Sequence, residues 1–593
     1  MEFDKKLTSL RHQKEESENL RKVYDNRWSR NLKLYKGIFR EQETSFSKVR
    51  QREKIFFRKI WATVWRLVAS MYYAFLKDPE AFKFEGRDTL RDPLKAQVLQ
   101  KMVEYRRDRM YAKDSLFIKF IWAFLSIFNY GWVCGKLCWE YKEGKSDEPK
   151  FILYPNEQVF PDLRAWTKEQ MRYIHFLNYM TKEEMEERGY KNLEDIEISS
   201  STTTNQLRQT RYMHDRDPLQ NPGENEYPKP GTYEEGSIDS NFQTYEVFES
   251  FWIEKGEVKF GIHNNFKVWL KEPENSPYGD TLPGIMGTCL TEMHKLFGEG
   301  FPEPLESPQE SYNYILNMRK DNVAQAMAGH TFVNRYGNVD LESLINRRVA
   351  GYTLMDDVEA VKHERVPDVT QSAYMEAAAD DGMMQEMSGV TAGKVGMERA
   401  EKATVAQINF TEANAKIDLY IALVGETFMK DFYAELARQI QRFETDEMVF
   451  RIANDRLKQE IQFDYGFDVY DLGMEADVIV NVGAGAVGRE IEIKQLLLAM
   501  DRAIITMQAA GNLAKLGAIP PGGMKIPNVM KFFELLLPKL GHKNVNDFFI
   551  NLQQPQMQAG GGGQGAGGAL QPQIGDMNMP TDMNMVQEGG QGG

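Results

Sequence analysis

Residues 307–331 read SPQESYNYILNMRKDNVAQAMAGHT, and this stretch opens the part of the chain that decides the fold. Ser307-Pro308-Gln309-Glu310 has the pattern of a capping box with proline at the first helical position, which predicts a helix start. Apolar residues then recur at helical spacing, and a glycine follows as a stop signal. The stretch therefore predicts one helix over residues 307–328, with an apolar stripe at Tyr312, Ile315, Leu316 and Val323.

The residues after this helix predict a small β element and two further helices. Short β-prone pieces occur at Thr331–Asn334 and Tyr352–Met355, and a second helix is predicted over Ser372–Met387. The sequence SGVTAGKVG at 388–396 contains three glycines, which predicts a loop at the end of that helix. A long helix is then predicted from about Ala400 to Arg442. None of these pieces carries a catalytic pattern.

This order of elements resembles the core of tailed-bacteriophage portal proteins, in which two stem helices flank a small clip domain and a tunnel loop precedes a long helix. The resemblance covers most of residues 20–550. It implies an α+β fold that is mainly helical, with an α/β wing, a two-helix stem, a small α/β clip and a helical crown, assembling as a ring. The expected domains are N-terminal helices and wing (1–306), stem helix 1 (307–328), clip (329–371), stem helix 2 (372–388), tunnel loop (389–402), long helix and return to the wing (403–486), crown (487–552) and a disordered tail (553–593).

The same resemblance implies a structural role without an enzymatic activity or a cofactor. Portal proteins form a ring of twelve copies at one capsid vertex, through which double-stranded DNA is packaged and ejected. The implied partners are further copies of the chain, DNA, the large terminase subunit, the head-tail adaptor, and the major capsid and scaffolding proteins. We therefore expect a virion protein that assembles in the host cytoplasm and does not enter a membrane.

The resemblance also implies three sets of functional residues. Stem contacts between copies would use the apolar stripe of the first helix. Contact with DNA would use basic residues of the tunnel loop, and docking of partner proteins would use charged residues of the clip. The tunnel-loop residues are Lys394, Arg399 and Lys402, and the clip residues are Arg347, Arg348, Asp356 and Asp357.

Composition agrees with a multidomain globular protein. The chain has 593 residues, of which 42% are hydrophobic, so several cores can form. Its net charge of −14 excludes a protein that binds nucleic acid over its whole surface, but it suits a conduit through which DNA slides. Three cysteines without a paired framework suit a reducing cytoplasm. The charged N-terminus is unlike a signal peptide, and the apolar run Phe120–Val133 is too short to span a bilayer.

The N-terminal region is basic and predicted to be helical. Residues 1–66 contain 18 Lys/Arg and 9 Asp/Glu, and aromatic residues are interleaved with the basic ones from Arg27 onward. Such interleaving can indicate nucleic-acid contact. An amphipathic helix pair with its aromatic side chains in a core explains the pattern equally simply, and we favour this second interpretation.

The following region predicts the mixed wing. The apolar run Phe120–Val133 predicts a buried helix that leads into a strand over Trp132–Tyr141, and Lys150–Asp162 and Tyr245–Leu270 also read as strands. Alternation predicts that Tyr245, Val247, Glu249, Phe251 and Ile253 share one face. Thr181–Glu184 is a second capping box, and Ser199–Asn241 predicts a long exposed loop.

Two glycine-rich sequences suggest nucleotide binding and need a structural test. Gly483–Gly488 matches the dinucleotide fingerprint after a predicted strand, Asp477–Val482, but a helix follows where a second parallel strand is needed. Gly389–Val395 is one residue short of a P-loop and lacks the hydroxyl that meets magnesium. A nucleotide-dependent enzyme using Gly483–Gly488 therefore remains an alternative function, as does a capsid or scaffold protein without a channel.

Metal binding has little support in the sequence. The eight histidines show no paired metal spacing, and the neighbouring acids Asp380 and Asp381 are more typical of a charged helix surface. We therefore expect no metal site.

Overall fold

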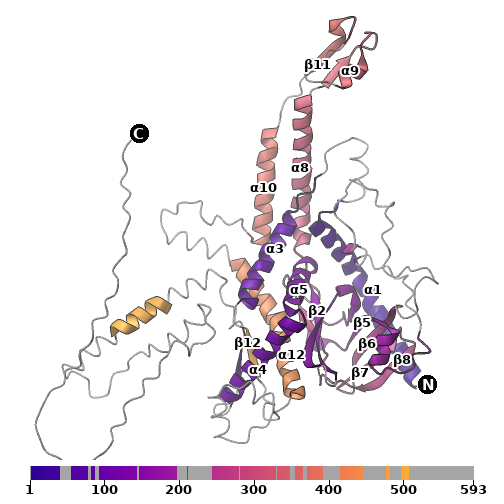
Figure 1. Ribbon diagram of the computed structural model, residues 1–593, viewed down its shortest axis with the longest axis vertical. Coiled ribbons are helices and arrows are strands. Elements are labelled where there is room, and N and C mark those ends of the chain that lie inside the picture. Colours follow the sequence, from indigo (N-terminus) through magenta and orange to yellow (C-terminus); the bar gives the residue numbers. More distant parts are fainter. Residues whose placement is uncertain are drawn as a thin grey trace, which may run out of the picture.

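The computed structural model describes residues 2–39, 55–77, 82–86, 92–142, 146–196, 207, 210–211, 244–279, 281–328, 330–346, 354–364, 370–390, 415–444, 476–480 and 496–506. Within these residues the fold is α+β and mostly helical, and every strand pairing is antiparallel. A broad mixed body carries two long helices, which project from it and hold a small β element at their far end (Figure 1).

The N-terminal helix α1 (Glu2–Lys36) lies along the body and is anchored by buried side chains. The Trp28 indole donates a hydrogen bond to the Tyr130 carbonyl at 2.8 Å. The buried Arg21 guanidinium donates to three backbone carbonyls of the turn at residues 156–159. The predicted N-terminal helix is therefore confirmed, and Trp28 lies in a core as the amphipathic interpretation requires.

The second N-terminal helix, α3 (Lys59–Met71), departs from that interpretation. Ile60, Val64 and Leu67 are fully buried, but Trp61 and Trp65 are about two-fifths exposed. The helix continues as one π-helical turn, η1, over Tyr72–Leu76. Its tryptophans therefore remain on the surface of the subunit.

The larger sheet of the wing has five antiparallel strands in the order β4-β5-β6-β7-β8. The predicted strands over residues 150–162 and 245–270 are confirmed, and Lys255-Gly256 forms a tight turn between two of them with positive φ at both residues. Thr181 and Glu184 form the predicted capping box of α6 (Lys182–Glu187). The strands are β4 (Val159–Pro161), β5 (Tyr173–Thr181), β6 (Thr244–Glu254), β7 (Glu257–Asn264) and β8 (Val268–Asn275).

The predicted alternation along β6 is confirmed, since Tyr245, Val247 and Phe251 pack together in one core. Phe248 and Trp252 pack on the opposite face beneath the start of α1, so both faces of this strand are covered. Ile253, near the end of the strand, is exposed. Alternation identified the strand but could not show that α1 covers the second face, because that contact joins residues far apart in the sequence.

A smaller sheet of three strands, in the order β3-β2-β9, joins the wing to the helical core. Helix α5 (Leu116–Tyr130) leads directly into β2 (Val133–Lys142), which confirms the predicted buried helix and strand. Gly131 ends the helix with φ near 76°, and an added Cβ there would meet the Gly298 carbonyl. The partner strands are β3 (Ser146–Tyr154) and β9 (Ile285–Gly287).

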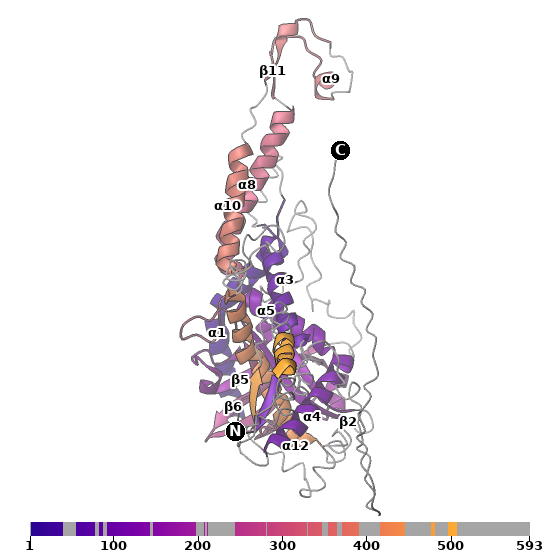
Figure 2. The same cartoon turned by 90° about the vertical axis from the view of Figure 1, so that its left-hand side faces the viewer.

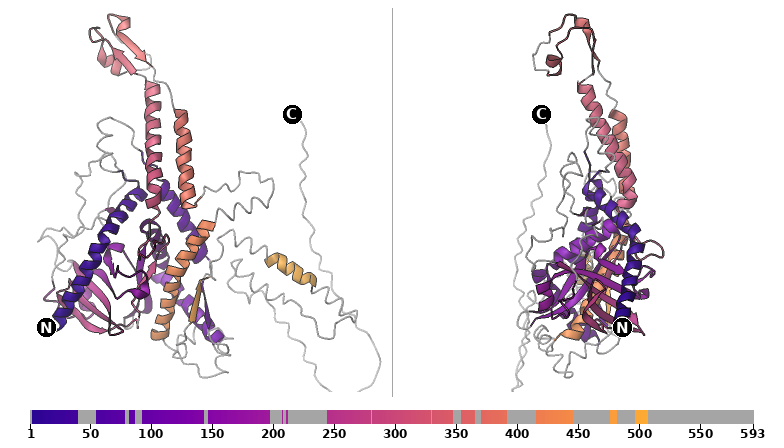
Figure 3. Two further views of the ribbon diagram at one scale, coloured as in Figure 1. Left: turned by 180° about the vertical axis from the view of Figure 1, so that it is seen from behind. Right: turned by 90° about the vertical axis from the view of Figure 1, so that its right-hand side faces the viewer.

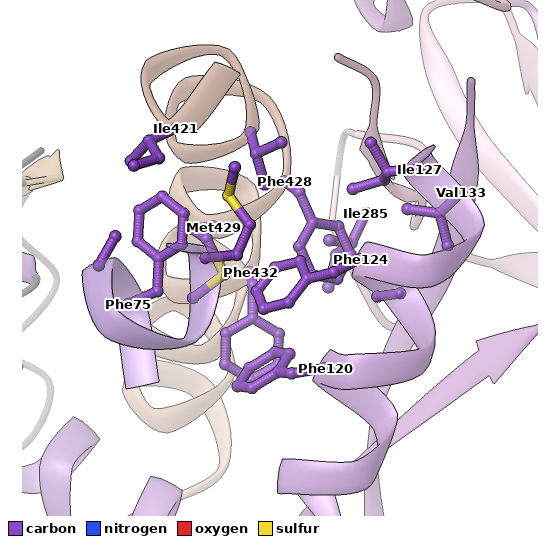
Figure 4. Packing of buried hydrophobic residues seen from close by; sticks show 14 of the residues in the cluster. Phe75, Phe120, Phe124, Ile127, Val133, Ile285, Ile421, Phe428, Met429 and Phe432 are labelled. Atoms are coloured by element: carbon purple, nitrogen blue, oxygen red, sulfur yellow. The ribbon is translucent and has the colours of Figure 1, made fainter. Parts of the chain in front are cut away.

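The main core lies where α5 packs against a long helix over residues 415–443. Residues 415–424 are helical, η6 (Gly425–Met429) is a π-helical turn, and α12 (Lys430–Phe443) completes the helix. Figure 4 shows aromatic side chains of α5 interleaved with those of η6 and α12, and Phe120 meets Phe432 edge to face with ring centroids 4.9 Å apart. The long helix predicted to end at Arg442 is therefore confirmed over residues 415–443.

A two-stranded sheet pairs β1 (Phe82–Gly86) with β12 (Ala476–Val480), and Phe82 stacks on Tyr433 at 3.7 Å between ring centroids. Strand β12 confirms the strand predicted before Gly483–Gly488. Its pairing is antiparallel, however, whereas a dinucleotide-binding unit needs parallel strands. The glycines themselves lie outside the described residues. Helix α4 (Asp92–Lys113) completes the body, and residues 496–506 form a further helical segment.

The two projecting helices are α8 (Pro302–Ala328) and α10 (Thr370–Ser388), and they lie side by side in both Figure 1 and Figure 2. The second helix agrees with its prediction to within two residues. The predicted start of the first helix at Ser307 is wrong, because α8 begins at Pro302 and Pro308 lies inside it. Burial of Leu305 and a hydrogen bond from the Gly300 amide to the Glu303 carboxylate stabilise the extra turn.

The β element at the far end of these helices is a two-stranded sheet of β10 (His330–Val333) and β11 (Val361–Glu364). The first strand was predicted, but the second was predicted at Tyr352–Met355 and lies later in the chain. Met355 forms only an isolated bridge with Val339. Local β propensity failed here because β11 is polar and exposed, and its pairing with β10 determines its position. A short helix, α9 (Leu341–Ile345), lies between the strands.

Candidate functional site

The pair of helices α8 and α10, called the stem below, is the first candidate functional element. The Arg319 guanidinium of α8 lies 4.2 Å from the ring centre of Tyr374 near the start of α10, which links the two helices. Figure 3 shows the same helix pair rising from the body in two further views. The stem is thus a slender projection with much of its surface open to other molecules.

The four predicted stem-contact residues do not form one exposed stripe. Leu316 is only 4% exposed, and Tyr312 packs edge-on against Phe57 within the same subunit. Ile315 is half-buried, and Val323 is exposed. The expectation that a single subunit exposes all four is therefore wrong, because the segment before α3 covers the lower part of α8.

Other apolar side chains of the stem are more exposed, and sequence reasoning missed them. Many of them are methionines, whose number in the chain, 30, was the available signal. Methionine adapts to irregular surfaces and is common where helices meet other chains. The exposed apolar side chains are Tyr314, Met318 and Met327 on α8, and Tyr374, Met375, Met383 and Met387 on α10.

A ladder of side-chain amides fastens the stem to the body. Asn317 both donates to and accepts from the backbone of Ile55, at 2.9 and 2.8 Å. Asn313 accepts from the Phe57 amide at 2.9 Å, and Gln309 donates to the Phe57 carbonyl at 2.7 Å. The amide side chains are four residues apart on α8, which is a rise of about 6.0 Å. Two residues of the extended segment before α3 span about 6.6 Å, so successive amides can reach alternate residues of that segment.

The acidic residues of α10 are part of the stem surface and do not form a metal site. Asp381 pairs with Lys59 of α3 at 2.9 Å. No cluster of metal-ligating side chains occurs among the residues that the structure describes. Helix α10 carries four carboxylates and no basic residue, so this part of the stem presents negative charge.

The segment that contains the predicted tunnel loop leaves the base of the stem, and the described residues on either side of it lie close together. Gly389 has φ near 71°, and Val390 is buried in the main core. The Lys416 ammonium group donates to the Glu386 carbonyl at 2.8 Å, so the chain returns beside the point at which it left. The three basic residues predicted to contact DNA, Lys394, Arg399 and Lys402, lie outside the described residues.

The β element at the tip, called the clip below, has exposed acidic and apolar side chains. Asp357 accepts a hydrogen bond from the Glu359 amide at 2.9 Å and so caps a turn, whereas the Asp356 amide donates to the Asn338 carbonyl. Both acidic side chains are exposed, as a docking role requires. Arg347 and Arg348 lie outside the described residues. Apolar side chains share this exposed surface, namely Phe332, Tyr336, Ile345, Leu354 and Val358.

A buried cluster in the wing has residue types that can form a catalytic site but lacks access. The Ser250 hydroxyl lies 2.8 Å from both His175 Nδ1 and His263 Nε2, and all three side chains are fully buried. Burial lowers the pKa of His175 to about 3 and that of His263 well below its ordinary value. Because no substrate reaches these neutral rings, the cluster is part of the core.

A second buried cluster joins the two wing sheets through charge. The Lys136 ammonium group of β2 pairs with the Glu249 carboxylate of β6, and Asn178 donates to the other carboxylate oxygen at 3.3 Å. Desolvation opposes the charged ammonium, but Glu249 outweighs it and the pKa of Lys136 is raised. This pair is structural, since it is enclosed by aromatic side chains.

Comparison with known proteins identifies a family for this chain. Within the described residues, no helix combines the length and apolarity needed to cross a membrane. No curated protein matches the sequence. The family model described as "Phage SU10 portal protein" matches residues 133–573, which include the wing sheets, both stem helices and the clip. Because that match covers well over half of the chain, the chain belongs to the phage SU10 portal protein family.

Proposed function

We propose that this chain forms a closed ring of twelve copies at one vertex of a phage capsid, and that double-stranded DNA passes through the ring during packaging and ejection. The observation that carries this proposal is the projecting stem with a clip at its tip, in a chain that belongs to a portal family. In the assembled ring, stems lie side by side around a channel, and the wing meets the major capsid and scaffolding proteins. The protein then resides in the virion after assembly in the host cytoplasm.

The charge of the stem suits a channel through which DNA slides. Carboxylates on α10 repel phosphates, so a channel wall formed by this helix does not hold DNA tightly. The loop after Gly389 then supplies the transient contact through Lys394, Arg399 and Lys402. Each ammonium or guanidinium group neutralises one phosphate, and such contacts weaken steeply as the salt concentration rises.

The clip serves as the docking platform in this proposal. Its exposed apolar side chains, together with Asp356 and Asp357, form a mixed surface of the kind that binds other proteins. Arg347 and Arg348 add positive charge to the same segment. The large terminase subunit binds this surface while the capsid fills, and the head-tail adaptor replaces it afterwards. A two-stranded sheet is marginal alone, and pairing with a neighbouring clip stabilises it.

Replacing residues 335–350 with a Gly/Ser linker of equal length tests the proposal. Helices α8 and α10 keep their contacts with the body, so rings should still form, but binding of the terminase and packaging of DNA should be lost. A matched linker of the same length in place of residues 445–460 keeps the clip intact and should retain terminase binding. Normal packaging by the clip variant would contradict the proposal.

The nucleotide-dependent enzyme keeps little support. Its fingerprint follows β12, whose described pairing with β1 is antiparallel. Mass spectrometry of the purified protein for a bound dinucleotide distinguishes this alternative from the portal.

A further inference from the structure

The face of α3 that carries Trp61 and Trp65, called the tryptophan face below, lacks a covering element among the described residues. The two residues are one helical turn apart, so their side chains share one face, and their ring centroids lie 6.1 Å apart. Trp61 is 42% exposed and Trp65 is 38% exposed. Tryptophan pairs of this kind are typical of binding surfaces.

The charges around the tryptophan face indicate an acidic partner. Between residues 59 and 76 the only charged side chains are Lys59 and Arg66, and both are basic. Lys59 is paired with Asp381 within the subunit, so Arg66 is the charge that a partner could meet. Arg66 lies next to Trp65 in the sequence and is exposed. A partner with apolar and acidic side chains therefore complements this surface.

Helix α10 of the same chain has these properties. Met383 and Met387 are one helical turn apart and are 56% and 48% exposed. Glu386 lies between them in the sequence, and all four charged residues of the helix are acidic. Methionine sulfur and aromatic rings attract each other at about 5 Å. Met383 and Met387 define a methionine face. Its two apolar side chains are one helical turn apart, as the two tryptophans are, and its neighbouring charge is opposite in sign to that of Arg66.

The two faces also lie at the same height, measured along the symmetry axis of the proposed ring. Within one subunit, Lys59 at the start of α3 and Asp381 of α10 are 2.9 Å apart. Rotation about an axis leaves every position along that axis unchanged. The Asp381 of the next copy in a ring therefore lies level with Lys59, and its Met383 and Met387 pass at the height of the tryptophan face.

From these observations we infer that the tryptophan face of one subunit (Trp61, Trp65) binds the methionine face of the adjacent subunit (Met383, Met387), with Arg66 and Glu386 beside the two faces. The contact is heterologous, since two different surfaces of one chain meet, and repeated rotation closes it into a ring. This inference rests on the proposed ring and names the surfaces that hold it together. It also makes the stem of each copy dependent on the body of its neighbour.

Thiol cross-linking tests the contact directly. The double variant Trp65→Cys/Met383→Cys is first shown to form rings by electron microscopy and is then treated with a short bismaleimide. The expected product is a ladder of covalent oligomers that extends beyond the dimer. Mixing the two single variants should give covalent dimers and nothing larger, and neither single variant alone should cross-link above the level of the wild-type protein, whose cysteines are Cys134, Cys138 and Cys289.

If another segment covers the tryptophan face, the cross-linking experiment gives a different product. A cross-link only within one chain shows that the chain's own α10 covers this face, and it overturns the inference. Intact rings without any cross-link overturn it as well, because another segment then covers the tryptophans, while the proposed ring stands. Absence of rings in the wild-type protein overturns both.

A charge exchange provides a second test that needs no cysteine. Arg66→Glu and Glu386→Arg should each weaken ring association by about two- to fivefold, as expected for one partly exposed ion pair. The double variant should recover the wild-type association. Additive losses in the double variant would overturn the pairing of Arg66 with Glu386 across the interface. Lys430→Glu, at a half-exposed position of α12 whose partner Glu426 belongs to the same helix, is the matched control and should leave association unchanged.

Discussion

Arg106 and Glu444 form a bidentate ion pair that joins α4 to the end of α12. Arg106 Nε and Nη2 each lie 2.6 Å from a different oxygen of the Glu444 carboxylate, and the two side chains are 2% and 1% exposed. Arg106 Nη1 also donates to the Asp147 carbonyl of β3 at 3.1 Å. One guanidinium group therefore holds together a helix of the body, the end of the central helix and a wing strand.

Breaking this pair should be costly. Glu444→Leu leaves the Arg106 charge buried without its partner, and we expect the free energy of unfolding to fall by about 3–5 kcal/mol. The double variant Arg106→Met/Glu444→Leu buries no charge and should recover most of the loss. Urea unfolding at a fixed protein concentration measures both. A single variant as stable as the wild type would show that the pair contributes little.

The amide ladder predicts a loss of stability that is specific to the base of the stem. Gln309 is fully buried, and Gln309→Leu removes its hydrogen bonds to the backbone of Phe57, Lys59 and Ile60. We expect a loss of about 2–3 kcal/mol, since buried donors are left unpaired. The matched control Gln325→Leu, on an exposed position four turns along α8, should change stability by less than about 0.5 kcal/mol. Equal effects of the two substitutions would argue against the ladder.

The buried histidines predict that acid destabilises the wing. Burial lowers the pKa of His175 from 6.5 to about 3, and that of His263 falls well below 6.5. The folded state therefore binds fewer protons than the unfolded state between these values, so this stability is complete above pH 6.5 and is lost as the pH falls. Each histidine contributes a slope of about 1.4 kcal/mol per pH unit.

Urea unfolding at pH 7.5 and 5.5 measures this dependence. The double variant His175→Gln/His263→Gln removes both titrating groups, so its stability should fall less between the two pH values than that of the wild type. The comparison uses only the pH-dependent difference, because the substitutions also alter packing. The same decrease in both proteins would exclude these histidines as the cause.

The tunnel-loop assignment predicts a defect in DNA handling without a defect in assembly. Changing Lys394, Arg399 and Lys402 together to Ala removes three phosphate-binding charges, and we expect normal rings with reduced packaging or retention of DNA. The loss should be larger at high salt if the remaining contacts are also electrostatic. Packaged genome length is the measurement. Normal length and normal retention in this variant would indicate a loop whose charges do not act on DNA.

The sequence predicted those elements whose signals are local. The buried helix before β2, the capping box at Thr181 and the second stem helix follow from apolar runs, capping residues and periodicity, and the structure contains all three. The start of α8 was missed because Leu305 and Glu303 add a turn through contacts with distant residues. The strand β11 was missed because its pairing, not its polar sequence, decides where it lies.

Surface exposure was the hardest property to predict. Leu316 and Val323 have the same place in the helical pattern, but only Leu316 is buried. Tyr312 of the same stripe packs against Phe57, which lies more than 250 residues earlier in the chain. The same difficulty hid the exposure of Trp61, which the favoured interpretation of the sequence placed in a core. Which apolar residues meet solvent depends on how distant segments pack, and this information is absent from a local pattern.

The central claim is that copies of this chain close into a ring around a channel, and direct imaging of the purified protein tests it most directly. Twelve copies of a 68.5 kDa chain give a particle of about 820 kDa. Electron microscopy should show rings with a central hole and with stems and clips projecting from one side, and mass photometry of the same sample should agree with the particle mass. A stable monomer or dimer at micromolar concentration, without rings in the images, would contradict the account.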